Sequence, residues 1–232
     1  ERSRSEDLTA QTNTYKYDDL YDTASEIEGI LNTTMEALQS KTVNYIDAAN
    51  MIKGDEIADY TMNYRVKKDS SLPTGYDAST DESASVYFYA DYDTTTSTWT
   101  YDQRAENATS DSLTEQINTY KAYANLETDI TSDPSPIVAD PASFRKALQS
   151  ITYNSLEYND GTATEVREKG DEVTDYTETY RLKKSGGVYT DSDLEPKSLS
   201  VYFYSSASTD KLRAERSRSE DLTAQTNTYK YD

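Results

Sequence analysis

The side chains that most often carry catalysis and transition-metal binding are missing from this sequence, which has no histidine and no cysteine. Without histidine there is no Ser-His-Asp or Cys-His centre and no imidazole ligand, and without cysteine there is no disulfide or thiolate site. Carboxylates are abundant, with 43 Asp and Glu residues, but no pair is set apart by the spacing that a general acid and base require. The sequence therefore predicts a protein that is not an enzyme, with no cofactor and no tightly bound metal.

Three carboxylates form one candidate calcium site. Asp191, Asp193 and Glu195 have the alternate spacing that presents oxygen ligands to Ca²⁺. The full 12-residue calcium-loop pattern is incomplete around them. A solvated acidic loop is the alternative, and the sequence favours it.

Two N-x-T sequons, at Asn32 and Asn107, are candidate glycosylation sites if the protein is exported. Neither is kept at the matching position of the internal repeat described below, where Ala142 and Arg216 stand. Coincidence in a chain rich in Asn and Thr is the alternative.

Tyrosine dominates the aromatic residues, with 22 Tyr against three Phe and one Trp, Trp99. Tyrosine supplies a large apolar area with a polar tip, and it favours β-strands, so ordinary sheet packing explains most of this content. Sugar stacking on exposed Tyr and Trp99 is the functional alternative. Exposed rings would indicate carbohydrate binding, and buried rings would indicate a structural role.

The chain begins and ends with the same 18 letters, because residues 215–232 repeat residues 1–18 as ERSRSEDLTAQTNTYKYD. Such a duplication is typical of a tandem array, of which this chain would be one 214-residue period with a short overlap. We expect the segment to be an inter-repeat strand, in which Leu8 and Tyr15 contact another copy. Their twins, Leu222 and Tyr229, are expected to turn toward the second half of this chain.

A second repeat relates the two halves of the chain. KGDEIADYTMNYRVKK in the first half matches KGDEVTDYTETYRLKK in the second, and SVYFY, ALQS and RAE…NTYK also recur in the same order. The offset between matched blocks changes from 110 to 116, 115 and 109, so insertions fall between the blocks. We therefore predict homologous domains over 19–125 and 126–232, with 1–18 as the terminal strand of a preceding repeat.

Hydrophobic periodicity predicts one helix and several strands in each half. The helices are expected around Ile27–Leu38 and from Asp140 to Ile151, each leading into extended chain after ALQS. Alternation predicts strands over 42–47, 60–67, 86–89, 99–104 and 113–123, with counterparts in the second half. The predicted fold class is α+β, with one short helix packed on an antiparallel sheet in each domain. A β-sandwich with a capping helix is the alternative.

The formal charge of −20 argues against nucleic acid and anionic membranes as partners, because both call for basic patches. No apolar run approaches the roughly 18 residues of a membrane span. The expected partners are other copies of the chain along a fibre axis, and glycans are a further candidate.

The chain resembles, in a general way, tandem-domain surface filaments and adhesin stalks, on the strength of its two levels of repetition. That resemblance implies a structural repeat unit of a secreted or cell-surface filament or stalk, located outside the cell. An extracellular carbohydrate-binding or adhesion module is the alternative. A small lipid carrier is a third, and it would need an apolar cavity.

Overall fold

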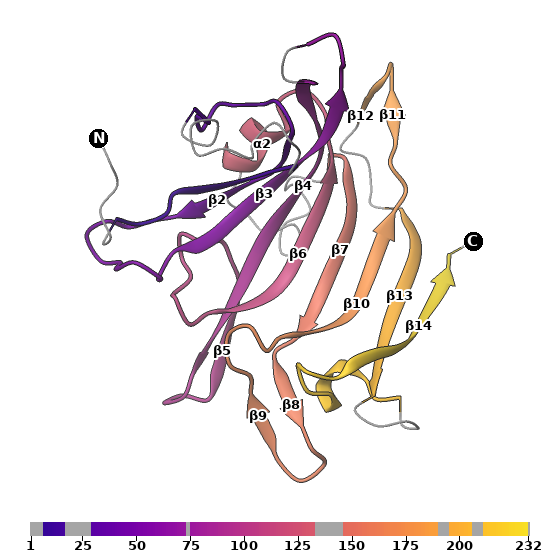
Figure 1. Cartoon of the computed structure of the whole chain (residues 1–232). Helices are drawn as coiled ribbons and strands as arrows, with labels where there is room; N and C mark the ends of the chain where they lie inside the picture. The colour runs from indigo at the N-terminus through magenta and orange to yellow at the C-terminus, as the bar shows by residue number, and fades with distance from the viewer. Residues whose placement is uncertain are drawn as a thin grey trace.

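The computed structural model describes residues 7–16, 29–72, 75–132, 146–189, 195–205 and 211–231. Within them, one antiparallel sheet of ten strands dominates the molecule (Figure 1). The strands are β1 (Gln11–Tyr15), β2 (Leu38–Tyr45), β3 (Ile57–Lys68), β4 (Tyr76–Asp93), β5 (Thr98–Gln103), β6 (Leu113–Lys121), β7 (Leu148–Ser155), β10 (Val173–Tyr180), β13 (Pro196–Ser205) and β14 (Leu222–Lys230).

The remaining elements are short. Two hairpins lie off the sheet, and helix α2 and the 3₁₀ turn η2 complete the described elements. Their bounds are β8 (Glu157–Asn159) with β9 (Thr164–Val166), β11 (Lys184–Ser185) with β12 (Val188–Tyr189), α2 (Leu126–Ser132) and η2 (Ala214–Arg216).

The strands follow one another across the sheet in the order β1-β2-β3-β4-β6-β7-β10-β13-β14, with β5 paired to β4 as a side branch. Strand β6 pairs with β7 in the middle of this path, so the sheet runs unbroken across the expected boundary between the halves. Strand β1 pairs with β2, so the expected boundary at residue 18 does not interrupt the sheet either. Strands β1 and β14 therefore form opposite edges of a single curved sheet (Figure 1).

This architecture corrects the predicted fold class. Two tandem α+β domains were expected, but the molecule is mostly β, with one large antiparallel sheet and a single α-helix among the described residues. A β-sandwich is not formed either, because one sheet carries all the long strands. The internal repeat is nevertheless visible in the sheet: β4 and β13, which carry the two SVYFY segments, hold matching places beside β6 and β14.

The predicted helices are wrong wherever the structure describes them. Leu38 begins strand β2, and Leu148 and Ile151 lie in strand β7. The residue before each strand has a left-handed backbone, with φ of 56° at Ala37 and 61° at Ala147, which a right-handed helix cannot include. The helical spacing was misleading because these apolar side chains are buried from strands. The earlier parts of both predicted helices lie in 17–28 and 133–145, outside the described residues.

Most of the predicted strands are confirmed, because their alternation matches one buried face. Tyr60, Met62 and Tyr64 are buried from β3, as the alternation predicted. A turn at residues 94–97 joins β4 to β5. The main core collects buried side chains from the strands of both halves and from α2, which supplies Leu126 and Ile130. The core is therefore shared between the halves, and this explains why they form one unit.

Candidate functional site: the two edges of the sheet

One segment of the repeat occurs three times and occupies three places in the sheet. It forms β1 at one edge, β6 in the middle and β14 at the other edge. The letters QTNTY are shared by β1 and β14, and β6 reads QINTY at the same place. The middle copy therefore shows what the segment does with a neighbour on both sides, and each edge copy shows it with one neighbour.

In β6 the segment is fully enclosed. Strand β4 pairs with one side of it and β7 with the other. The amide of Gln116 donates to the Asn118 side chain at 2.6 Å, and the Asn118 amide donates to the Tyr120 hydroxyl at 3.5 Å. These three side chains are at most 2% exposed. A polar ladder that satisfies its own hydrogen bonds can be buried at little cost in the core of the sheet.

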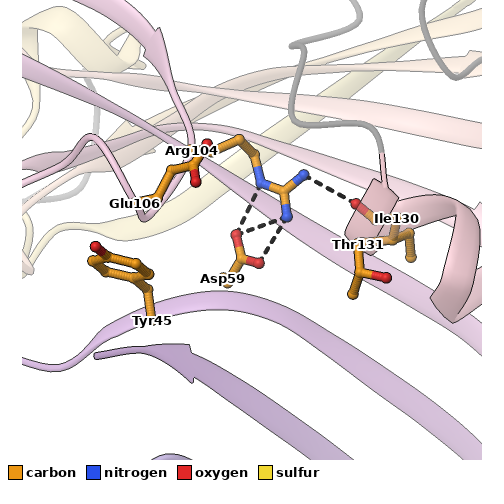
Figure 2. A pocket seen from close by; sticks show the side chains of 6 residues that line it. All are labelled: Tyr45, Asp59, Arg104, Glu106, Ile130 and Thr131. Carbon is orange, nitrogen blue, oxygen red and sulfur yellow. Dashed lines mark hydrogen bonds and ion pairs between the residues drawn. The ribbon is translucent and has the colours of Figure 1, made fainter. Parts of the chain in front are cut away.

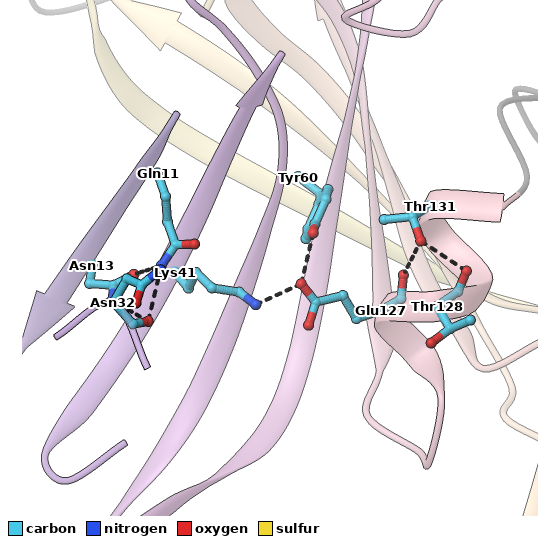
Figure 3. Close-up of polar contacts among 8 residues, drawn as sticks. All are labelled: Gln11, Asn13, Asn32, Lys41, Tyr60, Glu127, Thr128 and Thr131. Carbon is cyan, nitrogen blue, oxygen red and sulfur yellow. Dashed lines mark hydrogen bonds and ion pairs between the residues drawn. The ribbon is translucent and has the colours of Figure 1, made fainter. Parts of the chain in front are cut away.

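In β1 the same ladder is built at the edge. Gln11 donates to Asn13 at 2.7 Å, and both amides also reach the carbonyl of Asn32 (Figure 3). Asn13 also donates to the Tyr15 hydroxyl at 3.1 Å. The Tyr15 hydroxyl donates to the carbonyl of Thr34 at 3.2 Å. The loop at residues 31–34 therefore covers the outer end of the ladder in this copy.

The register of β1 on β2 equals the register of β6 on β7. Thr12 lies opposite Thr42 and Ile117 opposite Thr152, which are matched positions of the repeat. Both pairings shift by one residue at the same place, just before the tyrosine. The N–H that follows this tyrosine also repeats its bond, from Lys16 to the Ala37 carbonyl at 2.8 Å and from Lys121 to the Ala147 carbonyl at 2.9 Å.

Two side chains fasten the start of the segment in both places. The N–H of Thr9 donates to Glu56 at 2.7 Å, and the matching N–H of Thr114 donates to Glu172 at 2.8 Å. The amide of Asn44 donates to the Thr9 carbonyl at 2.8 Å, and Asn154 donates to the Thr114 carbonyl at 2.9 Å. The bond from Thr9 holds the pKa of the Glu56 carboxyl below its ordinary value.

These fastening residues were missed by the sequence analysis. The signal was present, because Glu56 and Glu172 occupy the same position of the repeated KGDE block and Asn44 and Asn154 match as well. A polar residue that both halves of the repeat retain at the same position indicates a contact that both halves make.

In β14 the segment has a neighbouring strand on one side only. That strand is β13, which corresponds to β4 beside the middle copy. Gln225 lies opposite Phe203, as Gln116 lies opposite Phe88 in the matched strand pair. The N–H of Tyr231 donates to the Lys197 carbonyl at 3.1 Å, and Ala122 donates to the matching Glu82 carbonyl at the same distance. The second side of β14 is the edge of the sheet.

The structure places the four predicted inter-repeat residues differently from the expectation. Tyr15 packs against the main core of its own chain, and Leu8 is half-buried, so this copy belongs with the strands that follow it. Leu222 and Tyr229 were expected to turn toward the second half, but they are 78% and 55% exposed. In β6 the matching Leu113 and Tyr120 are buried, Leu113 in the small core with Leu156 and Tyr120 in the main core.

The candidate calcium site is described only at Glu195, because Asp191 and Asp193 lie outside the described residues. The Glu195 carboxylate is paired with Lys183 at 2.9 Å and with Arg181 at 3.1 Å. These bonds to Lys183 and Arg181 lower its pKa. Its charge is thus already balanced by two side chains. Within the described ranges, no three Asp or Glu side chains group as metal ligands.

The two sequons lie in exposed turns. Asn32 was expected within a helix, but it lies in a turn next to β1, and Asn107 lies in the turn after β5. Both side chains are exposed.

The aromatic side chains mostly pack within the sheet. Trp99 stacks on Tyr101 with ring centroids 5.7 Å apart, and its indole N–H donates to Glu157 at 2.9 Å. It also packs against the small core that contains Leu156. Tyr101 is the half-exposed ring of this pair, at 50%. The other exposed tyrosines of the described residues lie in or just after β14, away from Tyr101 on β5, so the exposed rings do not form the row that carbohydrate binding calls for. Packing therefore explains most of the aromatic content.

The most enclosed charged pair in the described part of the chain closes the space between β3 and α2. Arg104 donates from Nε and Nη2 to the two carboxylate oxygens of Asp59, at 2.9 and 2.8 Å (Figure 2). Its Nη1 also donates to the Ile130 carbonyl in α2 at 3.4 Å. The adjoining cavity has about 100 Å³ and is also lined by Tyr45, Glu106 and Thr131. Because the charges of Arg104 and Asp59 are already paired with each other, we interpret this cavity as part of a structural contact and not as a ligand site.

A second set of contacts attaches α2 to the first strands. Glu127 accepts hydrogen bonds from Lys41 of β2 at 2.6 Å and from Tyr60 of β3 at 2.7 Å (Figure 3). The helix therefore contacts β2, on which β1 pairs, and the next strand, β3.

Burial raises the pKa of Glu115, next to the start of the ladder in β6, to about 7. The neighbouring Asp102 carboxylate raises this pKa further, and the N–H of Asp102 opposes the shift by donating to Glu115 at 3.0 Å. The folded state therefore binds this proton more tightly than the unfolded state, whose carboxyl titrates near 4.5. The stability from this proton is complete below about pH 4.5 and is lost as the pH rises through 7.

We expect Glu115→Gln to become progressively more stable than the unmodified chain between pH 5 and pH 8, because glutamine carries no charge to desolvate. Urea unfolding across this range measures the difference between the two proteins. Glu106→Gln, at an exposed carboxyl, is the control for the same change of side chain outside the buried ladder. A constant difference for Glu115→Gln would contradict the prediction.

Comparisons with known proteins give no information about function. No family model, curated protein or solved structure matches the chain. Among the described residues, no helix has the length and apolar character needed to cross a membrane.

Proposed function

We propose that this chain is the structural repeat unit of a secreted or cell-surface filament or stalk, which lengthens by continuing one β-sheet from period to period. The observation that carries the proposal is the identical segment at opposite edges of the sheet. Strand β1 pairs with β2 through the side of the segment that faces β7 in the middle copy, β6. Strand β14 pairs with β13 through the side that faces β4 in β6. The two edges are therefore complementary halves of one junction.

The composition supports an exposed, structural role. A charge of −20 keeps long assemblies soluble and discourages lateral association between them. Edge strands normally need protection from unwanted pairing, and a repeat that uses its edges for extension resolves this problem. Carbohydrate binding beside Trp99 and Tyr101 is the second candidate, and it is the weaker one because Trp99 is held by its bond to Glu157 and packs against the small core.

The proposal predicts rods from longer arrays. A second period is added by following residues 1–232 with residues 19–232, and further periods are added in the same way. Eight strands, β2 to β14 along the sheet path, would lengthen a rod by at most about 38 Å per period at about 4.8 Å per strand. Electron microscopy of arrays of four and eight periods should show particles of constant width whose length doubles.

Beads at irregular spacing, or compact particles of equal length, would contradict a structural role based on one continuous sheet. Unmodified single chains at equal mass concentration are the control, and they should show no rods.

A further inference from the structure

We infer that the free side of β14 binds strand β2 of a following copy of this chain, in the same register that β1 adopts on β2. This inference rests on the proposed function and specifies its junction. Thr226 would lie opposite Thr42 of the following copy, Asn227 opposite Lys41, and Tyr229 opposite Leu38. The corresponding pairs of β1 with β2 are present in the structure.

The backbone of β14 presents the required groups on its free side. In an antiparallel strand, successive residues direct their N–H and C=O groups to alternate sides. The N–H of Tyr231 donates to the carbonyl of Lys197 in β13. The backbone groups of Thr226, Thr228 and Lys230 therefore face the free edge. In the first copy of the segment, the backbone groups of Thr12 and Lys16, which correspond to Thr226 and Lys230, face β2. The N–H of Lys16 donates to the Ala37 carbonyl, and the Ala10 carbonyl accepts from the N–H of Asn44.

The side chains that fasten the segment would be supplied by the following copy. Its Glu56 would accept from the N–H of Thr223, and its Asn44 would donate to the Thr223 carbonyl, because Thr9 and Thr114 make these bonds. Its Asn32 carbonyl would accept from Gln225 and Asn227, as it does from the identical residues of β1.

Apolar burial favours the same junction. Leu222 and Tyr229 are largely exposed on β14, whereas Leu113 and Tyr120, at the matching places of β6, are 4% and 2% exposed. In β6, Leu113 is covered by Leu156, which follows β7. The following copy has Ile46 at the matching place after β2, so it offers an apolar side chain for Leu222.

A single chain with an intact β1 has its own β2 covered, so it should stay monomeric at moderate concentration. Proline removes a backbone N–H and is tolerated only where a strand does not need that donor. Thr12→Pro in the full chain removes a donor aimed at β2, so it should loosen β1 and uncover β2 while β14 stays intact. Thr226→Pro makes the same change in the same local sequence, but there the lost donor faces the free edge.

Light scattering coupled to size exclusion measures the mass of each full-length variant over a range of concentrations, at physiological salt because the chains repel one another. Thr12→Pro should form dimers and larger head-to-tail oligomers, at least doubling the mean mass at high concentration. Thr226→Pro and the double variant should keep the mass of one chain. An excess of a peptide of residues 1–18 should reduce the Thr12→Pro oligomers toward monomers by covering β2.

Equal association of Thr12→Pro and the double variant would overturn the inference, because the association would not need β14. A Thr12→Pro chain that keeps its β-sheet circular dichroism and remains monomeric at every concentration would overturn it as well. The rod measurement on multi-period arrays tests the proposed function separately from either result.

The register has its own test, because the chain has no cysteine. In the Thr12→Pro chain, cysteines at Thr42 and Thr226 should form intermolecular disulfides on mild oxidation, since directly opposed residues have suitable Cα separations. Cysteines at Thr42 and Thr228 are the matched control, two residues out of register, and should cross-link at least several-fold less. Equal cross-linking by the two pairs would overturn the register.

Discussion

Tyr120→Ala is expected to lower the free energy of unfolding by about 3–5 kcal/mol, the usual cost of truncating a large buried aromatic side chain. Tyr229→Ala, in the same local sequence, is expected to change it by less than about 0.5 kcal/mol. The difference arises because Tyr120 is 2% exposed between β4 and β7, whereas Tyr229 is 55% exposed at the edge of the sheet. Urea unfolding of the single chain measures both values.

The partly buried Tyr15 provides an internal control, because it packs against the main core from the edge strand β1. Tyr15→Ala should have an intermediate cost. Similar costs for all three variants would show that the tyrosine makes its contribution within its own strand, and would contradict the dependence on neighbouring strands.

Arg104→Ala is expected to lower the free energy of unfolding by about 3–5 kcal/mol, because it leaves the Asp59 carboxylate without its buried partner. Arg104 is 7% exposed and also donates to the Ile130 carbonyl of α2. Arg213→Ala breaks the matching pair with Asp175, but Arg213 is 43% exposed, so the expected cost is about 0–1 kcal/mol. Thermal and urea unfolding compare the two variants.

Asp59→Asn/Arg104→Ala, which removes the unpaired charge as well, should recover part of the stability lost by Arg104→Ala. A cost for Arg213→Ala as large as that for Arg104→Ala would show that solvent exposure does not distinguish the pairs, and would contradict the explanation from burial.

Strands were predictable where one face of the strand is buried and the other is exposed to solvent. Tyr60, Met62 and Tyr64 alternate with polar residues, and this period of two survives in β3. The helices were not predictable in the same way, because Leu38, Leu148 and Ile151 fit both a helical stripe and a buried strand. The left-handed turns at Ala37 and Ala147 decided between them, and alanine is not a residue that normally marks such a turn.

The candidate site was predictable in part. The duplicated segment identified the residues that occupy both edges of the sheet, but it assigned residues 1–18 to a preceding unit. In the structure, β1 pairs with β2 of its own chain. The contacts of Glu56 and Asn44 with Thr9 link positions that are 47 and 35 residues apart, and no local pattern reports such a distance.

The sequence alone determined the two levels of repetition, the alternating strands and the lack of histidine and cysteine, because each of these is a property of residue types and their spacing. Only the tertiary structure decided that the halves share one sheet and that α2 is attached to β2 and β3. It also decided which copy of the repeated segment is buried. A strand carries backbone hydrogen-bonding groups on both sides. Identical sequences cannot specify whether neighbouring strands bond to one of these sides or to both.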